Sequence, residues 1–306
     1  MKVAVVDVGT NSTRLLVAEV VDGRVVAELE RRTTVTRLGE GVDMDGRLGE
    51  AAMERVFEAC AGYRAAIDRA QVERVVAILT SAVRDAANGA AFQRELERRF
   101  GFEAQTISGA REARLTYTGA TAGRRHDQPT LVLDIGGGST EVVVGHGDEI
   151  EFFVSTQLGS VRHTERHLHT DPPAPAELAA CRAAARAELE AAVSPEVRER
   201  VHQGIAVAGT PTSFAAIDLR LDPYDPERVE GHRLTLAGAE RILAELTALP
   251  VEERRRVTGL HPDRAPTIVA GGAILVEAMR LFGLGEIEVS ERDILHGAAL
   301  EAAENV

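Results

Sequence analysis

The sequence predicts an α/β protein built from two copies of one βββαβαβα domain. The strongest indication is an internal repeat: Asp7–Val17 (DVGTNSTRLLV) aligns without gaps on Asp134–Val144 (DIGGGSTEVVV), 127 residues further on. Both copies are flanked by apolar runs typical of buried strands, and helical apolar spacing follows each set of strands. A repeat of this kind sets the whole fold, so we expect a duplicated domain pair with a ligand-binding cleft between its halves.

The first half begins with three apolar runs, at 3–6, 15–20 and 25–29. The Asp22-Gly23 pair before the third run is a strong hairpin signal, which predicts an antiparallel meander. Residues 49–70 have helical apolar spacing, residues 75–79 resemble a buried strand, and a helix, a strand and a helix are expected at 90–100, 104–107 and 110–118.

The second half repeats this order. Strands are expected at 131–135, 142–144, 150–154, 205–208 and 286–289, and helices at 175–201, 235–248, 266–282 and 292–303. The polar segment 123–128 (GRRHDQ) predicts the domain break. The domains are therefore expected at 1–122 and 123–306, with the C-terminal helix, about 291–306, as a candidate to pack back on the first domain.

Composition excludes several classes of function. The net charge of −13 over 306 residues disfavours binding to nucleic acid or to an anionic membrane. Lys2 is the only lysine, which excludes a P-loop lysine and a Schiff-base lysine. Cys60 and Cys181 are too few for a disulfide framework, and no signal peptide or apolar membrane-length stretch is present, so a cytoplasmic protein is expected.

Each copy of the repeat places an aspartate at a strand end, followed by small residues. Glycine and short hydroxyl residues leave peptide N–H groups uncovered, and a tight turn of them binds anions. One copy alone would indicate a glycine-rich hairpin turn, but two copies with matched flanks favour phosphate binding. The candidate phosphate ligands in these turns are Gly9, Thr10, Asn11, Ser12, Gly136, Gly137, Gly138 and Ser139.

Acidic residues stand at both turns: Asp7, Asp134 and Glu141. Phosphate and carboxylate repel each other unless a cation lies between them, and oxygen ligands of this kind suit Mg²⁺. We therefore expect these three acids to hold a magnesium ion. For Asp7 the alternative is a turn-capping role.

Two further segments follow predicted strands. Ser108 is a candidate N-cap, and Glu112 lies in the first turn of the helix that it begins, where a carboxylate also suits the helix dipole without any function. Arg84 could bind a phosphate or form a surface ion pair. The equivalent segment of the second half, at 209–213, adds Gly209 and Thr210 as phosphate candidates.

The sequence resembles the exopolyphosphatase/guanosine pentaphosphate phosphohydrolase family, which has the actin/sugar-kinase superfold. The resemblance spans nearly the whole chain and rests on VAVVDVGTNSTRLLVAEV (3–20), RLGEGVD (37–43), TSAVRDAANG (80–89), ISGAREARLTYTGA (107–120), LVLDIGGGSTEVVVG (131–145), VAGTPTS (207–213) and RAPTIVAGGAIL (264–275). It implies two RNase H-like (actin-like) domains.

The resemblance also implies roles for individual residues. Glu112 matches the catalytic glutamate, Asp134 and Glu141 match acids around the metal and phosphate, and Arg84 and the turns at 9–12 and 136–139 match phosphate contacts. The family commonly has two consecutive glutamates where this chain has Arg111-Glu112, and its longer members carry an additional helical region after the second domain. The chain therefore resembles the short, two-domain members.

The resulting expectation is a Mg²⁺-dependent, homodimeric exopolyphosphatase that releases the terminal orthophosphate, mainly from short chains. Guanosine pentaphosphate is the alternative substrate, and an ATP-dependent kinase or a non-catalytic polyphosphate-binding protein are alternatives of other classes. Against the acidic net charge, a polyphosphate channel would need local basic residues, with Arg111, Arg114, Arg162, His163 and Arg166 as candidates. For the segment with His163, His167 and His169, a solvated face is the other interpretation.

Overall fold

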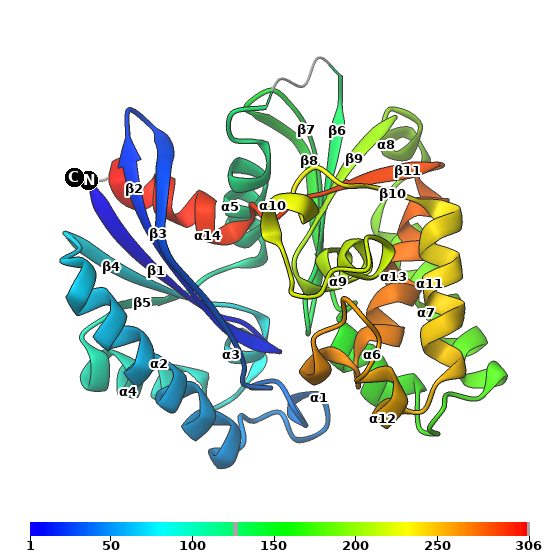
Figure 1. The fold of residues 1–306 in the computed structure, drawn as a ribbon, viewed down its shortest axis with the longest axis horizontal. Coiled ribbons are helices and arrows are strands. Elements are labelled where there is room, and N and C mark those ends of the chain that lie inside the picture. The colour runs from blue at the N-terminus through cyan, green and yellow to red at the C-terminus, as the bar shows by residue number, and fades with distance from the viewer. Residues whose placement is uncertain (125–127, 305–306) are drawn as a thin grey trace. The chain divides into compact units, whose positions relative to one another are not determined.

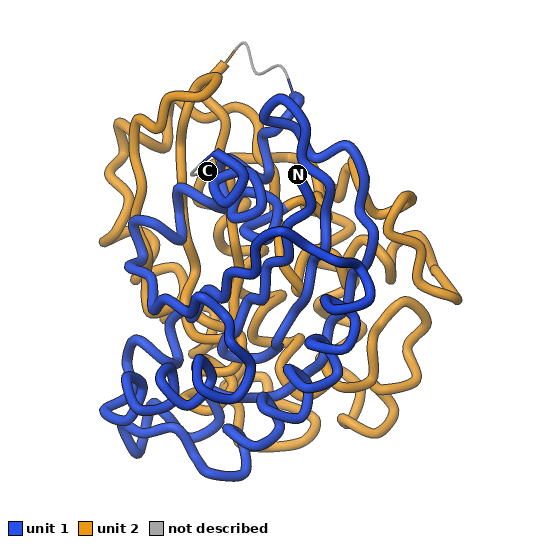
Figure 2. The backbone as a smooth tube through the Cα atoms, turned by 90° about the vertical axis from the view of Figure 1, so that its left-hand side faces the viewer, with its two compact units in different colours: residues 1–124, 293–306 blue, residues 125–292 orange. Residues whose placement is uncertain are grey.

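The computed structural model describes residues 1–124 and 128–304. The chain forms two compact units (Figure 2): unit 1 contains residues 1–124 and 293–306, and unit 2 contains residues 125–292. Residues 125–127, within the segment where the domain break is expected, lie outside the described residues. Across the described part of the chain, no helix combines the length and the apolar character needed to cross a membrane.

Unit 1 is built on a five-stranded sheet that begins with the expected antiparallel meander (Figure 1). The strands lie in the order β3 (Arg24–Val35), β2 (Ser12–Val21), β1 (Lys2–Val8), β4 (Arg74–Leu79) and β5 (Glu103–Thr106). β4 runs parallel to β1, and β5 runs parallel to β4. Side chains from both faces of β1 are buried, which is why its sequence is a continuous apolar run.

Helices cover both faces of this sheet. α2 (Glu50–Ala70) and α4 (Gly89–Phe100) supply one core, and α5 (Gly109–Thr121) and α14 (Ile294–Glu304) supply the other, while α1 (Val42–Asp45) and α3 (Ser81–Asp85) are short. α5 and α14 pack closely, since a Cβ atom on Gly119 would lie 1.9 Å from the Asp293 carbonyl oxygen. Only glycine fits at that contact.

Unit 2 repeats the topology of unit 1. Its sheet has the order β10 (Arg233–Thr235), β11 (Glu286–Val289), β9 (Gln203–Val207), β6 (Thr130–Ile135), β7 (Thr140–His146) and β8 (Glu149–Thr156). The run β8-β7-β6-β9-β11 has the same strand directions as β3-β2-β1-β4-β5. The sequence repeat is therefore a structural repeat, and the predicted duplicated α/β fold is confirmed. β10 is an addition at the edge.

The helices of unit 2 surround a largely apolar core. They are α6 (Ser160–His167), α7 (Pro175–Ala192), α8 (Pro195–Glu199), α9 (Gly209–Asp218), α10 (Pro226–Val229), α11 (Leu236–Ala248), α12 (Val251–Arg254), a 3-10 turn (Pro262–Arg264) and α13 (Ile268–Leu281). α13 is buried from Ile268 to Met279, which explains its glycine- and alanine-rich sequence. A Cβ atom on Gly272 would lie 2.3 Å from the Phe214 ring.

The helical region expected at about 175–201 consists of two helices. α7 ends at Ala192 and α8 begins at Pro195, because a proline ring cannot continue a preceding helix without losing a backbone hydrogen bond. α3, α6 and α9 are helices that apolar periodicity did not reveal, since each is short or rich in small hydroxyl residues.

Candidate active site

The two repeated turns have the same closing geometry. We call residues 7–12 loop 1 and residues 134–139 loop 2. In loop 1 the Gly9 N–H donates to the Ser12 carbonyl oxygen at 3.0 Å, and in loop 2 the Gly136 N–H donates to the Ser139 carbonyl oxygen at 3.0 Å. A Cβ atom at either glycine would lie within 3.0–3.1 Å of that oxygen, so both positions favour glycine.

Loop 2 is oriented by α6, which follows β8. The backbone N–H groups of Ser160 and Val161 donate to the carbonyl oxygens of Gly136 and Gly137 at 2.9 Å, and Arg162 Nε donates to the Gly138 carbonyl oxygen at 2.9 Å. In a trans peptide the carbonyl and the following N–H point in opposite directions. The N–H groups of residues 137–139 therefore point away from these donors, as an anion-binding turn requires.

Gly159 makes this orientation sterically feasible. A Cβ atom on Gly159 would lie 2.2 Å from the Gly137 carbonyl oxygen and 2.5 Å from the Gly138 carbonyl carbon. Because these neighbours are backbone atoms, a side chain at residue 159 would displace loop 2. Gly159 was not among the predicted site residues, and its position directly before the polar segment of α6 is the only signal for it in the sequence.

Loop 1 is held in the same manner by residues 36–39, which follow β3. The N–H groups of Thr36 and Arg37 donate to the Asn11 carbonyl oxygen at 3.0 and 2.9 Å, and the Gly39 N–H donates to the Thr10 carbonyl oxygen at 2.8 Å. The carbonyl groups of Thr10 and Asn11 therefore point toward residues 36–39, and the N–H groups that follow them point away from this segment. The RLGEGVD stretch thus supports loop 1.

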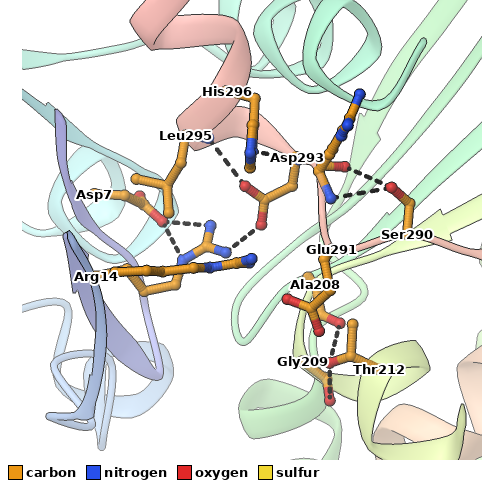
Figure 3. Close-up of polar contacts among 12 residues, drawn as sticks. Asp7, Arg14, Ala208, Gly209, Thr212, Ser290, Glu291, Asp293, Leu295 and His296 are labelled. Carbon is orange, nitrogen blue, oxygen red and sulfur yellow. Dashed lines mark hydrogen bonds and ion pairs between the residues drawn. The ribbon is translucent and has the colours of Figure 1, made fainter. Parts of the chain in front are cut away.

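Asp7 lies at the end of β1, opposite Arg14 on β2 (Figure 3). Asp7 Oδ2 accepts hydrogen bonds from Arg14 Nε at 2.9 Å and Nη2 at 2.6 Å, and Arg14 Nη1 also pairs with Asp293 Oδ2. Asp7 Oδ1 is buried without a hydrogen-bond partner among the described residues. Burial, together with the nearby charge of Asp293, raises the pKa of Asp7 in spite of Arg14. Burial also acts to raise the pKa of Asp293, but Arg14, Arg31 and His296 together lower it below its usual range.

Asp134 and Glu141 are opposite each other in the antiparallel β6–β7 pair, and both are buried. Directly paired residues point to the same face of a sheet, with Cβ atoms about 4.5–5.5 Å apart. Ser155 Oγ donates to Glu141 Oε1 at 2.7 Å. Two carboxylates at this spacing repel each other unless a cation or a shared proton lies beside them.

Among the described residues, no group of three or more histidine, cysteine, aspartate or glutamate side chains is arranged to hold a metal ion. Mg²⁺ is often held by only one or two protein carboxylates, with water and substrate phosphates completing its shell. The Asp134–Glu141 pair fits that mode of binding. Asp7 fits it less well, because one of its carboxylate oxygens is engaged by Arg14.

Glu112 lies in the first turn of α5, as predicted. Ser108 is confirmed as the N-cap, since its Oγ accepts from the Arg111 N–H. Glu112 is buried and its Oε2 accepts from Arg84 Nη1 at 2.9 Å, while Arg84 Nη1 also lies 3.0 Å from the Ile107 carbonyl oxygen. The candidate base and a candidate phosphate ligand are thus brought together within unit 1.

Gly209 and Thr210 begin α9, the counterpart of α3 in unit 2. A Cβ atom on Gly209 would lie 1.1 Å from Arg264 Nη1, so the guanidinium group occupies the space beside this glycine and a side chain at residue 209 would displace it. The N-terminal turn is fastened by Thr212 Oγ1, which donates to the Ala208 carbonyl oxygen at 3.0 Å (Figure 3). Arg264 belongs to one of the family-like stretches but was not among the predicted site residues.

The basic channel candidates are not all available for a substrate. His163 is 1% exposed, so it is not part of a solvated face or of a basic track; both expectations are wrong for this residue because α6 packs it inward. Arg162 is engaged with loop 2, and Arg111 pairs with Glu301. Arg114 and Arg166 are exposed.

The geometry defines a class of protein: a duplicated α/β fold with two equivalent turns suited to anions. The Ppx/GppA phosphatase family matches residues 16–305. Exopolyphosphatase 2 of Mycobacterium tuberculosis is 35% identical, covering 99% of this chain and 98% of the relative. The crystal structure of an exopolyphosphatase-like protein has a TM-score of 0.93 at 31% identity, covering 98% of this chain and 97% of that one.

A further solved structure, the Ppx/GppA family member of Aquifex aeolicus, has a TM-score of 0.82 at 30% identity, covering 100% of this chain and 98% of that one. The chain belongs to the Ppx/GppA phosphatase family. It has the actin-like two-domain fold of that family and is a hydrolase acting on phosphoanhydride bonds. The predicted family and fold class are confirmed.

Proposed function

We propose that this protein is a Mg²⁺-dependent exopolyphosphatase, which hydrolyses the terminal phosphoanhydride bond of inorganic polyphosphate and releases orthophosphate. The observation that carries the proposal is the orientation of loop 2, whose carbonyl groups are turned toward α6 and Arg162 so that consecutive N–H groups face the other way. Such a turn binds the oxygens of a phosphoryl group. The named exopolyphosphatases among the relatives support the choice of substrate.

Asp134 and Glu141 are the residues that would hold Mg²⁺. When bound, the ion would neutralise phosphate charge and make the terminal phosphorus more accessible to a nucleophile. The buried Asp134–Glu141 pair supports this assignment, since two adjacent carboxylates favour the binding of a cation. Ser155 would keep Glu141 Oε1 in a fixed position through their hydrogen bond.

Glu112 is the proposed general base. Its carboxylate accepts a proton from a water molecule while the water oxygen forms a bond to the terminal phosphorus. The bridging P–O bond breaks, and its electron pair leaves with the shortened polyphosphate. Arg84 Nη1 donates to the Glu112 carboxylate and to the Ile107 carbonyl oxygen, and the N–H groups on Nε and Nη2 would bind phosphoryl oxygens.

Short chains are the proposed substrates. The protein has a net charge of −13, so the additional phosphates of a long polymer should add little binding free energy. The affinity should therefore increase little with chain length. On long chains the enzyme is then expected to dissociate between cleavages and to produce a ladder of intermediates. That the protein is a cytoplasmic homodimer stays a prediction from its sequence.

The test is a comparison of phosphate release from short polyphosphate, long polyphosphate and guanosine pentaphosphate, with Mg²⁺ and without any acceptor. Release that is most efficient on short polyphosphate is expected. If phosphate is released only from guanosine pentaphosphate, that nucleotide and not polyphosphate is the substrate. Phosphate transfer that requires an acceptor would indicate a kinase and overturn the proposal. Undegraded long chains that coexist only with fully degraded product would show a processive enzyme and overturn the short-chain preference.

A further inference from the structure

Two buried hydroxyl groups from distant parts of unit 1 contact each other beside loop 1. Thr10 Oγ1 and Ser81 Oγ are 2.8 Å apart. Thr10 belongs to loop 1 and is 7% exposed, whereas Ser81 is the first residue of α3 and is 2% exposed. Thr10 is a predicted phosphate ligand, but Ser81 had no assigned role.

The hydrogen atoms of this pair cannot all be used within the pair. Each hydroxyl carries one hydrogen, and one hydrogen bond between the two oxygens uses only one of them. Neither hydroxyl has another hydrogen-bond partner among the residues that the structure describes. One O–H donor is therefore left over, and leaving it unsatisfied in a buried site would cost free energy. An oxygen acceptor supplied from outside the protein would satisfy it.

The direction of the Thr10 side chain is determined by packing. A Cβ atom on Gly39 would lie 2.2 Å from Thr10 Cγ2, so the Thr10 methyl group occupies the space left by that glycine. The Gly39 N–H also donates to the Thr10 carbonyl oxygen at 2.8 Å. Threonine has few accessible χ1 angles, and the methyl contact together with the Ser81 contact leaves one orientation for the hydroxyl.

α3 connects this pair to the candidate catalytic group. Ser81 and Arg84 are both residues of α3, and Arg84 Nη1 donates to Glu112 Oε2 at 2.9 Å. The same five-residue helix thus contacts loop 1 through one side chain and the candidate base through another. Ser81 is placed where it can set the position of Thr10 relative to Arg84.

We propose that Ser81 is a positioning residue for phosphoryl binding: the Ser81 hydroxyl orients Thr10 Oγ1, and the remaining O–H of the pair donates to a substrate phosphoryl oxygen. The inference rests on the proposed function, because it requires an anionic phosphoryl ligand at loop 1. It predicts that Thr10 and Ser81 act as one unit in binding.

The experiment is a double-mutant cycle with Ser81→Ala, Thr10→Val and the combined variant. Thr10→Val keeps the methyl group that packs on Gly39 and removes only the hydroxyl. Each single variant is expected to raise the KM for short polyphosphate about tenfold, the usual scale for one lost hydrogen bond to a charged acceptor, with kcat within about twofold. The combined variant should raise KM no more than about twofold beyond either single variant.

Thr118→Val, which alters an exposed hydroxyl of α5, serves as the control and should leave KM unchanged. Multiplied effects in the combined variant, an unchanged KM in Ser81→Ala, or a loss confined to kcat would overturn the inference. Equilibrium binding of inorganic triphosphate separates this failure from that of the proposed function. If the wild-type protein binds triphosphate but releases no phosphate, the proposed function fails, and a tenfold weaker binding by Ser81→Ala would still support the inference.

Discussion

Arg14 and Glu141 occupy equivalent positions in the two units, and each faces an equivalent aspartate across an antiparallel strand pair. In unit 1, Arg14 is opposite Asp7 and neutralises it directly. In unit 2, Glu141 is opposite Asp134, so the same position adds a second negative charge. A duplicated turn has therefore become an internal ion pair in one unit and a candidate cation site in the other.

The charge difference predicts a metal dependence that originates in unit 2. Asp134→Asn and Glu141→Gln should each raise the Mg²⁺ concentration for half-maximal phosphate release by roughly tenfold or more, because each removes one carboxylate charge from the site. Titration of Mg²⁺ into metal-depleted enzyme measures this. Glu149→Gln, at an exposed position of β8, is the matched control. Full activity of the wild-type protein in excess chelator would contradict the assignment.

Glu112→Gln should abolish most of the turnover without unfolding unit 1. The glutamine amide oxygen can still accept from Arg84, but it cannot take a proton from water. We expect kcat to fall by roughly 100-fold or more, with triphosphate binding retained. Steady-state kinetics and a melting curve are sufficient to measure this. Glu58→Gln, at an exposed position, is the control. Near-normal turnover of a folded Glu112→Gln variant would show that Glu112 is not the general base.

Gly159→Ala adds a single methyl group, which should displace loop 2. The new Cβ atom would lie 2.2 Å from the Gly137 carbonyl oxygen, and a backbone neighbour cannot rotate away. A shift of this kind in a phosphate-binding turn should lower kcat/KM on the order of 100-fold. Gly62→Ala is the control, since nothing lies within 4 Å of its added Cβ. The higher helix propensity of alanine should raise the free energy of unfolding by about 0.5–1 kcal/mol through α2. Equal kcat/KM values for the two variants would refute the role of Gly159.

Tyr63 predicts a loss of stability at alkaline pH. It donates to the Thr13 carbonyl oxygen at 2.7 Å, and burial raises its pKa from near 10 to about 12. The unfolded chain therefore loses this proton at a lower pH than the folded protein. The contribution to the free energy of unfolding is complete below pH 10 and is lost as the pH rises to 12.

Tyr63→Phe separates this contribution from others. It should cost about 1 kcal/mol at neutral pH through the lost hydrogen bond and should decline less steeply than the wild-type protein above pH 10. Denaturant midpoints at neutral and alkaline pH measure both effects. Burial also raises the pKa of Cys60 to about 12 in both proteins, whereas the charge of Cys60 that helps to raise the Tyr63 pKa acts only in the wild-type protein. Parallel declines of the two proteins would contradict the prediction.

Much of the candidate site could be predicted because its residues are close in sequence. In loop 1 and in loop 2, an aspartate is followed two residues later by glycine and then by hydroxyl residues, and this local pattern encodes two tight turns. The internal repeat is enough to predict that the two turns are equivalent. The N-cap at Ser108 and the first-turn position of Glu112 follow from the same kind of local chemistry. The helical break before Pro195 had an equally local signal that the apolar spacing obscured.

What the sequence determined by itself is the duplicated α/β architecture, the two anion-type turns and the acids beside them, because turn chemistry and apolar periodicity act over a few residues. Tertiary structure alone decided the long-range partners: Arg84 with Glu112, Thr10 with Ser81, and Arg14 with Asp293. These pairs are separated by 28, 71 and 279 residues. They form only when the strands and helices of unit 1 pack together, since no local pattern specifies which distant charge or hydroxyl will lie opposite.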